Sequence, residues 1–205
     1  VEALLSSFQD ERREALVFLY ETHDPAAYTR AVEATRVKLS KMQGFTQTGR
    51  FEKKQNNIRQ SLDSFPAIQN ELLARKLSGT EVIRYYSDGI IKHLIDIIAA
   101  ITKENNANGF VCYTDMINAI EYSALESDLT TTVMGENTLN QDLYDVIVLQ
   151  SGKAQSELDS FKRIAEPNAI KKLYACYRDG DFVEMNIQKE NFRNHMFKID
   201  GDPFE

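Results

Sequence analysis

Apolar residues recur at intervals of three and four along most of the chain, which is the spacing of an amphipathic α-helix. Alternation with a period of two, typical of half-buried strands, does not persist for long anywhere. Glycine and proline positions divide the pattern into eight segments. We expect helices at 2–21, 24–43, 51–76 with a break at Pro66, 79–104, 109–134, 137–165, 167–178 and 182–200.

Short motifs mark several of the predicted helix starts. Asp24 followed by Pro25 is the pairing of an N-cap with a first helical residue. Ser78 and Glu81 have the spacing of a capping box, in which side chain and backbone satisfy each other's hydrogen bonds. Asn137 is predicted to cap the helix that follows it.

The eight predicted helices indicate an all-α fold made of two sets of four. The linkers near 43–49 and 105–109 are short enough for up-and-down packing of neighbouring helices. A chain of 205 residues can bury a substantial core, either as one large domain or as two small bundles.

Composition and charge narrow the functional classes. Lys and Arg total 24 against 31 Asp and Glu, so the formal net charge is −7, and no long basic run occurs. This balance argues against nucleic-acid binding. The most apolar stretch, 90–101, is interrupted by Lys92, His93 and Asp96, so it is not expected to span a membrane. The chain begins within a helical pattern without a signal peptide, and we expect it to be a soluble piece of a longer protein.

Motifs for catalysis and for cofactor binding are missing. None of His23, His93 and His195 follows a glutamate by three positions, as a di-iron site in a helical bundle requires. Phosphate-loop, haem-attachment and nucleophile motifs are also absent. Cys112 and Cys176 are far apart and form no zinc motif; a disulfide and two buried thiols both stay open. We predict no enzymatic activity, no metal and no cofactor.

The first predicted helix carries an arginine within its apolar stripe. The stripe residues are spaced alternately by four and three: Val1, Leu5, Phe8, Arg12, Ala15 and Leu19. A guanidinium stays charged and is costly to bury alone. One interpretation is an internal ion pair with Glu11, Glu14 or an acid on a facing helix, or extension of the side chain to the bundle edge. The other is an anion receptor, because the planar fork of N–H donors matches an oxyanion.

Polar residues also lie on later stripes. In the predicted helix 109–134, the series contains Phe110, Tyr113, Ile117, Ile120, Ala124, Ser127, Thr131 and Met134. Gln150 interrupts the next stripe, and Gln9 lies beside the first one. Ser127, Thr131 and Gln150 are candidates to line a small polar pocket, although helical Ser and Thr also bond to the carbonyl one turn back.

Four segments of the chain resemble the landmarks of a known protein family. Residues 8–16 resemble its Leu-Gln-x-Glu-Arg-Gly opening, and 77–87 resemble its Ser-x-x-Glu followed by Tyr-Thr. Residues 120–128 are similar to Lys-Glu-x-Ala-Gly-x-Glu-Arg-Ala, and 191–200 to the family's Trp-Phe and Lys-Ile-Asp close. These landmarks follow one another over nearly the whole chain in the order of the nitrate- and nitrite-sensing (NIT) family, which the chain therefore resembles.

The resemblance implies a rod-like arrangement of two four-helix bundles, with 1–205 as a single sensor domain. It also implies ligand sensing through two arginines. Arg12 matches the first, whereas the second falls on Ser127, and the family's glycines are replaced by Arg13 and Ala124. The expected ligand contacts are therefore Arg12, Gln9, Ser127 and Thr131.

The function implied is that of an extracytoplasmic sensing domain in a transmembrane signalling receptor. Its expected ligand is nitrate, nitrite or another small anion, and helix movement would pass to an output module such as a kinase or cyclase. The expected assembly is a membrane-anchored homodimer. The alternative is a structural or protein-interaction bundle that has lost the ligand, with Arg12 fully paired to carboxylates and no pocket beside it.

Overall fold

The structure of the chain is a computed structural model, which describes residues 1–42, 52–104, 108–178, 180 and 187. Within these residues it contains helices and no strand, so the predicted all-α class is confirmed. The elements are α1 (Glu2–Val17), η1 (Phe18–Thr22), α2 (Pro25–Met42), α3 (Glu52–Asp63), α4 (Phe65–Leu73), α5 (Gly79–Tyr86), η4 (Ser87–Ile91), α6 (Lys92–Glu104), α7 (Asn108–Glu136), α8 (Gln141–Ile164) and α9 (Pro167–Tyr177). The chain divides into two compact units, Val1–Ile164 and Ala165–Glu205.

The first seven predicted helical segments are confirmed. Segment 2–21 corresponds to α1 with η1, and segment 79–104 corresponds to α5, η4 and α6 in succession. The predicted break within 51–76 is also confirmed, because Pro66 lies in the first turn of α4. There its missing N–H would have no helical partner in any case. The helix predicted at 182–200 lies outside the described residues.

Two of the predicted helix starts are confirmed and one is wrong. The Ser78–Glu81 capping box is present in both directions, and the Asp24 carboxylate accepts from the backbone N–H of Ala26 at 3.0 Å. Asn137 does not cap α8, since it takes a left-handed backbone (φ 50°) just beyond the end of α7. Asn140 takes that place, its side chain accepting from the backbone N–H of Leu143 at 2.8 Å.

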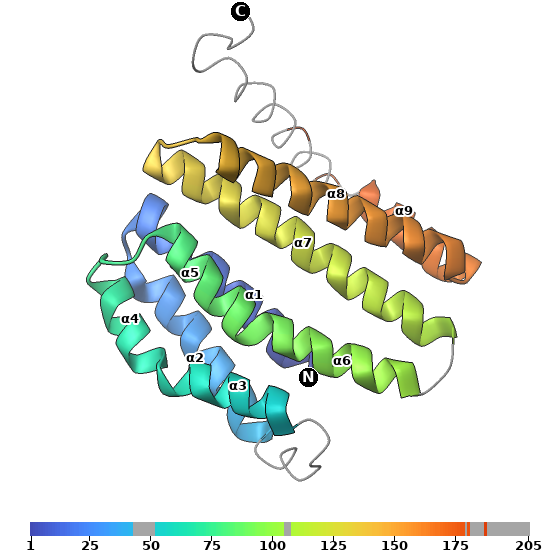
Figure 1. Ribbon diagram of the computed structural model, residues 1–205, viewed down its shortest axis with the longest axis horizontal. Coiled ribbons are helices and arrows are strands. Elements are labelled where there is room, and N and C mark those ends of the chain that lie inside the picture. Colours follow the sequence, from blue (N-terminus) through green and yellow to red (C-terminus); the bar gives the residue numbers. More distant parts are fainter. Residues whose placement is uncertain (43–51, 105–107, 179, 181–186, 188–205) are drawn as a thin grey trace, which may run out of the picture. The chain divides into compact units, whose positions relative to one another are not determined.

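In the first unit, α1 packs against α2, α5 and α7 (Figure 1). Helix α7 packs against α6 as well, and α8 lies along α7. The largest fully buried apolar and aromatic side chains are Phe8, Leu16, Tyr28, Leu72, Tyr86, Ile90, Ile91 and Ile147. In the second unit, α9 starts at Pro167 and contains no buried residue. The arrangement as two separate four-helix bundles in a rod stays a prediction.

The prediction that the apolar stripe of α7 is its buried face is wrong in part. Ile120 is 51% exposed and Met134 is 64% exposed. The buried positions instead include Glu121, Asp128 and Thr132, which are polar. A stripe search based on hydrophobicity follows apolar residues, so it selected a neighbouring face of the same helix.

Among the described residues, two helices contain π-helical turns, in which backbone hydrogen bonds span five residues instead of four. The segment η1 continues α1, and η4 joins α5 to α6 without interrupting the helix. Such turns often occur at functional sites. Here η4 begins at Ser87, a residue that contacts the buried arginine described below.

Two further findings concern the described residues. No helix among them combines the length and the apolar character that crossing a membrane requires. Cys112 is buried and Cys176 is exposed, and neither forms a disulfide, so the interpretation of two buried thiols holds only for Cys112.

Candidate functional site

The guanidinium of Arg12 lies at the centre of a polar cluster that joins three helical elements. Its Nε donates to Asp128 Oδ2 at 2.6 Å, and its Nη1 donates to Glu121 Oε1 at 2.6 Å. Nη1 also lies 2.6 Å from Ser87 Oγ, and Nη2 lies 3.4 Å from Glu121 Oε2. The cluster therefore connects α1 with η4 and α7. We call these residues, together with Gln9, the Arg12 network.

Burial makes the charge balance of this network important. The Arg12 side chain is 0% exposed, and the side chains of Glu121 and Asp128 are 6% and 8% exposed. Burial alone would lower the pKa of Arg12, but the two carboxylates outweigh it and raise that pKa. Burial raises the pKa of the Asp128 carboxyl, and the guanidinium offsets this only in part. With both acids ionised, one positive charge faces two negative ones.

Gln9 belongs to the same network. Its Nε2 donates to Glu121 Oε2 at 2.7 Å, one α-helical turn before Arg12 on α1. The structure therefore brings two of the expected ligand contacts together, and both bind the same glutamate. Arg13, which is not part of the apolar stripe, has in contrast a side chain that is 63% exposed.

Ser127 and Thr131 are half-buried on α7. They lie beside Asp128 and Thr132 in sequence, but no hydrogen bond among the described residues joins them to Arg12 or Gln9. Gln150 on α8 has the buried side-chain oxygen that lacks a hydrogen-bond partner in the described part of the chain. A pocket lined by these three residues stays a prediction of the sequence.

A second buried polar chain starts from the residue next to Arg12. Glu11 is 1% exposed, and its Oε1 accepts from the Tyr86 hydroxyl at 2.8 Å. The Tyr86 and Tyr28 hydroxyl oxygens are 3.3 Å apart. Burial raises the pKa of the Glu11 carboxyl, while hydrogen bonds from Thr35 and Tyr86 offset part of this effect. Glu11 is thus a buried acid bonded to hydroxyls, with no salt bridge among the described residues.

The substitution Glu11→Gln is expected to change how stability depends on pH. A carboxyl whose pKa is raised by folding stabilises the fold below its unfolded pKa, and this contribution is lost as pH rises through the folded value. Glutamine keeps an acceptor for Tyr86 without the charge. We expect the variant to be about 1–2 kcal/mol more stable than the parent at pH 8 and nearly equal at pH 4.

Urea unfolding at pH 4, 6 and 8 measures this difference. Glu71→Gln, at an exposed position, is the matched control and should change the free energy of unfolding little at any pH. Equal pH profiles for Glu11→Gln and the parent would show that Glu11 is not the source of the dependence.

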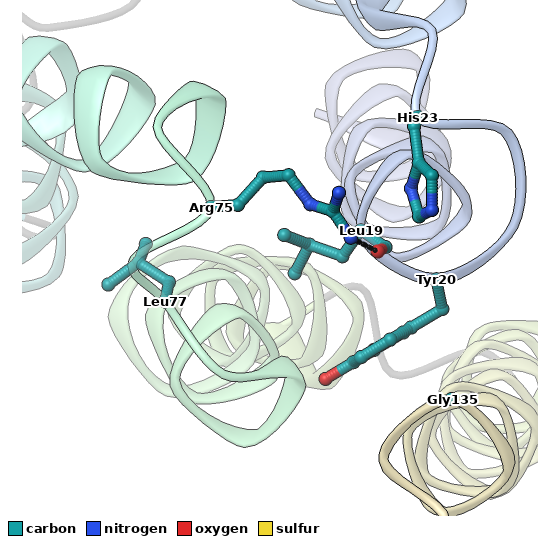
Figure 2. Close-up of a pocket in the computed structure, with 6 residues that line it drawn as sticks. All are labelled: Leu19, Tyr20, His23, Arg75, Leu77 and Gly135. Carbon is teal, nitrogen blue, oxygen red and sulfur yellow. Dashed lines mark hydrogen bonds between the residues drawn. The ribbon is translucent and has the colours of Figure 1, made fainter.

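A hollow of about 330 Å³ opens where the ends of several helices of the first unit meet, and no residue of the Arg12 network lines it. Figure 2 shows the residues that line it: Leu19, Tyr20, His23, Arg75, Leu77 and Gly135. They come from η1, the link to α2, the link between α4 and α5, and the end of α7. We call this hollow the bundle-end pocket. Its arginine and histidine were not singled out by the sequence patterns.

Within the described ranges, no group of three or more His, Cys, Asp or Glu side chains is placed to hold a metal ion. Arg12 is buried and paired with carboxylates, whereas Arg75 and His23 are exposed at the bundle-end pocket.

The chain was compared with known protein families. A family model described as nitrate and nitrite sensing (NIT) matches residues 3–190. The matched range includes every described helix after the first residue of α1, and both the Arg12 network and the bundle-end pocket. Searches of curated proteins and of solved structures found no match.

Proposed function

The chain belongs to the nitrate and nitrite sensing family, and on this basis we propose that residues 1–205 form a single ligand-sensing domain of a signalling receptor. The domain itself senses, and any catalysis belongs to an attached output module. Extracytoplasmic location, membrane anchoring and a homodimeric state are parts of this proposal.

The proposed ligand is nitrate, nitrite or another small anion, and the proposed contacts are Arg12, Gln9, Ser127 and Thr131. The observation that carries the proposal is the position of Arg12, which is completely buried between α1, η4 and α7. Because Glu121 and Asp128 occupy its donors, the anion has to compete with a carboxylate. The described network then represents the closed state of the sensor.

The network also supplies a route for the signal. Its hydrogen bonds connect α1 with helices more than seventy positions away in sequence. An anion that replaces one carboxylate removes a bond between α1 and α7, and the two helices gain freedom to shift. A ligand changes such an equilibrium only as far as it binds one packing more tightly than the other.

Asp128→Asn tests the proposal directly. The variant removes one competing negative charge and should bind nitrate or nitrite about tenfold more tightly than the parent, since a charged hydrogen bond contributes about 1.5–3 kcal/mol. Isothermal titration calorimetry at constant ionic strength measures the affinities, and circular dichroism verifies that the helices are kept. Asp88→Asn, an exposed aspartate on η4, is the matched control.

The alternative function is a structural or protein-interaction bundle without a ligand. One observation favours it: Arg12 is already paired with two carboxylates. It predicts that neither the parent nor Asp128→Asn binds any small anion at the Arg12 network. Equal affinities of the two proteins would likewise contradict competition at Arg12.

A further inference from the structure

Arg75 presents an incompletely paired guanidinium to the bundle-end pocket. Its Nη2 donates to the backbone carbonyl of Leu19 at 3.1 Å, which fixes the direction of the side chain (Figure 2). Within the described residues it forms no ion pair with a carboxylate, in contrast to Arg12, Arg13 and Arg36. The guanidinium is thus held in place by a neutral acceptor, while other N–H donors remain for a ligand.

His23 lies across the pocket from Arg75 in Figure 2. Its Nδ1 is 3.2 Å from the carbonyl oxygen of Phe18, so this nitrogen is the donor of that hydrogen bond. In the neutral ring Nε2 then carries a lone pair and accepts a hydrogen bond, for example from water, so the N–H donors for an oxyanion come from Arg75. Each of the two side chains is hydrogen-bonded to a backbone carbonyl of η1, that of Leu19 for Arg75 and that of Phe18 for His23.

Both residues occupy backbone positions that normally favour glycine. His23 has a φ of 55° and Arg75 a φ of 56°, the left-handed region in which a β-carbon is unfavourable. Each follows the end of a helix, where glycine or asparagine is the usual residue. The chain instead places two nitrogen-rich side chains there, and both line the same hollow.

We infer that the bundle-end pocket is a binding site for a small planar oxyanion, either a carboxylate or nitrate or nitrite. A guanidinium donates two parallel hydrogen bonds to such a group. This inference goes beyond the proposed function, because the pocket shares no residue with the Arg12 network. An anion can enter it without displacing a carboxylate from an arginine.

The remaining walls restrict the ligand to a small monoanion. Leu19 and Leu77 offer apolar surface for a short aliphatic part. The Tyr20 hydroxyl is already engaged, donating to Glu136 Oε1 at 2.6 Å and accepting from the backbone N–H of Gly79 at 2.6 Å. The nearby Glu136 carboxylate disfavours a second negative charge on the ligand. The volume, about 330 Å³, is at the lower end of the range for small-molecule pockets.

The residues that line the bundle-end pocket come from three parts of the chain. The relative packing of these parts would have to change for the domain to transmit a signal. Tyr20 belongs to η1, Arg75 and Leu77 to the link between α4 and α5, and Gly135 to the end of α7. The Arg12 network joins α1, η4 and α7 farther along the same helices. A ligand in the pocket therefore acts on the same helices from their ends.

Arg75→Gly tests the inference, because glycine is compatible with the left-handed backbone and removes only the side chain. Titrations with sodium nitrate, nitrite and acetate are followed by calorimetry and by NMR of the histidine and arginine side chains, with chloride at the same ionic strength as reference. We expect Arg75→Gly to weaken binding about tenfold or more. Arg84→Ala, an exposed arginine on α5, should leave the affinity unchanged.

Three results would overturn the inference: an unchanged affinity in Arg75→Gly, equal shifts with chloride, or no binding of any oxyanion by the parent. Its failure is distinguishable from that of the proposed function. Loss of binding in Arg75→Gly with no gain in Asp128→Asn supports the pocket and contradicts the Arg12 placement. Unchanged binding in Arg75→Gly together with tighter binding in Asp128→Asn contradicts the pocket inference alone. A preference for acetate over nitrate, or the reverse, identifies the anion type.

Discussion

Arg12→Met is expected to lower the free energy of unfolding by about 3–5 kcal/mol, the range seen when one partner of a buried ion pair is removed. Methionine fills much of the volume, so the main loss is electrostatic. Glu121 and Asp128, which are 6% and 8% exposed in the parent, would lose their cation. Two buried, unpaired carboxylates must then bind protons or draw water into the core.

Urea unfolding at pH 7 measures this effect. Arg13→Met is the matched control, since Arg13 is on the same helix with a side chain that is 63% exposed, and its change should be within about 0.5 kcal/mol. The triple variant Arg12→Met, Glu121→Gln, Asp128→Asn should recover part of the stability because it removes the uncompensated charges. Equal stability of Arg12→Met and Arg13→Met would contradict the geometry of the network.

Gly135→Ala is expected to destabilise the chain by about 1–3 kcal/mol, the usual range for overpacking. A β-carbon at this position would overlap the ring of Tyr20. The backbone at Gly135 has no positive φ, so the effect is steric and not conformational. Displacement of Tyr20 would also break its bonds to Glu136 and to the backbone of Gly79.

Gly152→Ala is the matched control in α8. Nothing lies within 4 Å of a β-carbon added there, so the exchange should stabilise the helix by about 0.5–1 kcal/mol. Adding Tyr20→Ala to Gly135→Ala should show strong non-additivity, because the overlap disappears. Urea unfolding of five proteins separates these terms: the parent, Gly135→Ala, Tyr20→Ala, the double variant and the control Gly152→Ala. A stabilising Gly135→Ala would mean that Tyr20 does not pack on α7.

The burial of Arg12 was predictable from sequence, whereas its partners were not. Spacing by three and four placed Arg12 on the inner face of the first helix without any tertiary information. An acid on a facing helix was among the interpretations considered, but Glu121 and Asp128 are 109 and 116 positions away. Periodicity describes one helix and does not tell which turn of another helix lies opposite.

The same reason explains the error in α7. Hydrophobicity selected the face with Ile120 and Met134, because the buried face contains a glutamate, an aspartate and a threonine. Buried polar residues are stable when they are hydrogen-bonded, and their partners become known only from the packing. The available signal was the pair Glu121 and Asp128, two acids seven positions apart in the segment that also carries the expected contacts Ser127 and Thr131.

The bundle-end pocket could not be predicted from sequence patterns. Its two nitrogen-rich residues, His23 and Arg75, follow helix ends where composition rules expect glycine or asparagine. The hollow forms because the ends of separate elements meet in space, and no local pattern encodes that meeting. The Ser78 capping box, in contrast, depends on four consecutive residues and was predicted in full.

The π-helical turn η4 has a consequence for chain length. Such a turn contains one residue more than an α-helical turn, and it is commonly understood as a single insertion into a helix. Val82 and Tyr86 precede it on the buried face, and Ile90 and Leu94 continue that face. Relatives shorter by one residue between Ser87 and Ile91 would therefore restore regular winding at this point. Indels elsewhere in the same helix would rotate all later core residues by about 100°.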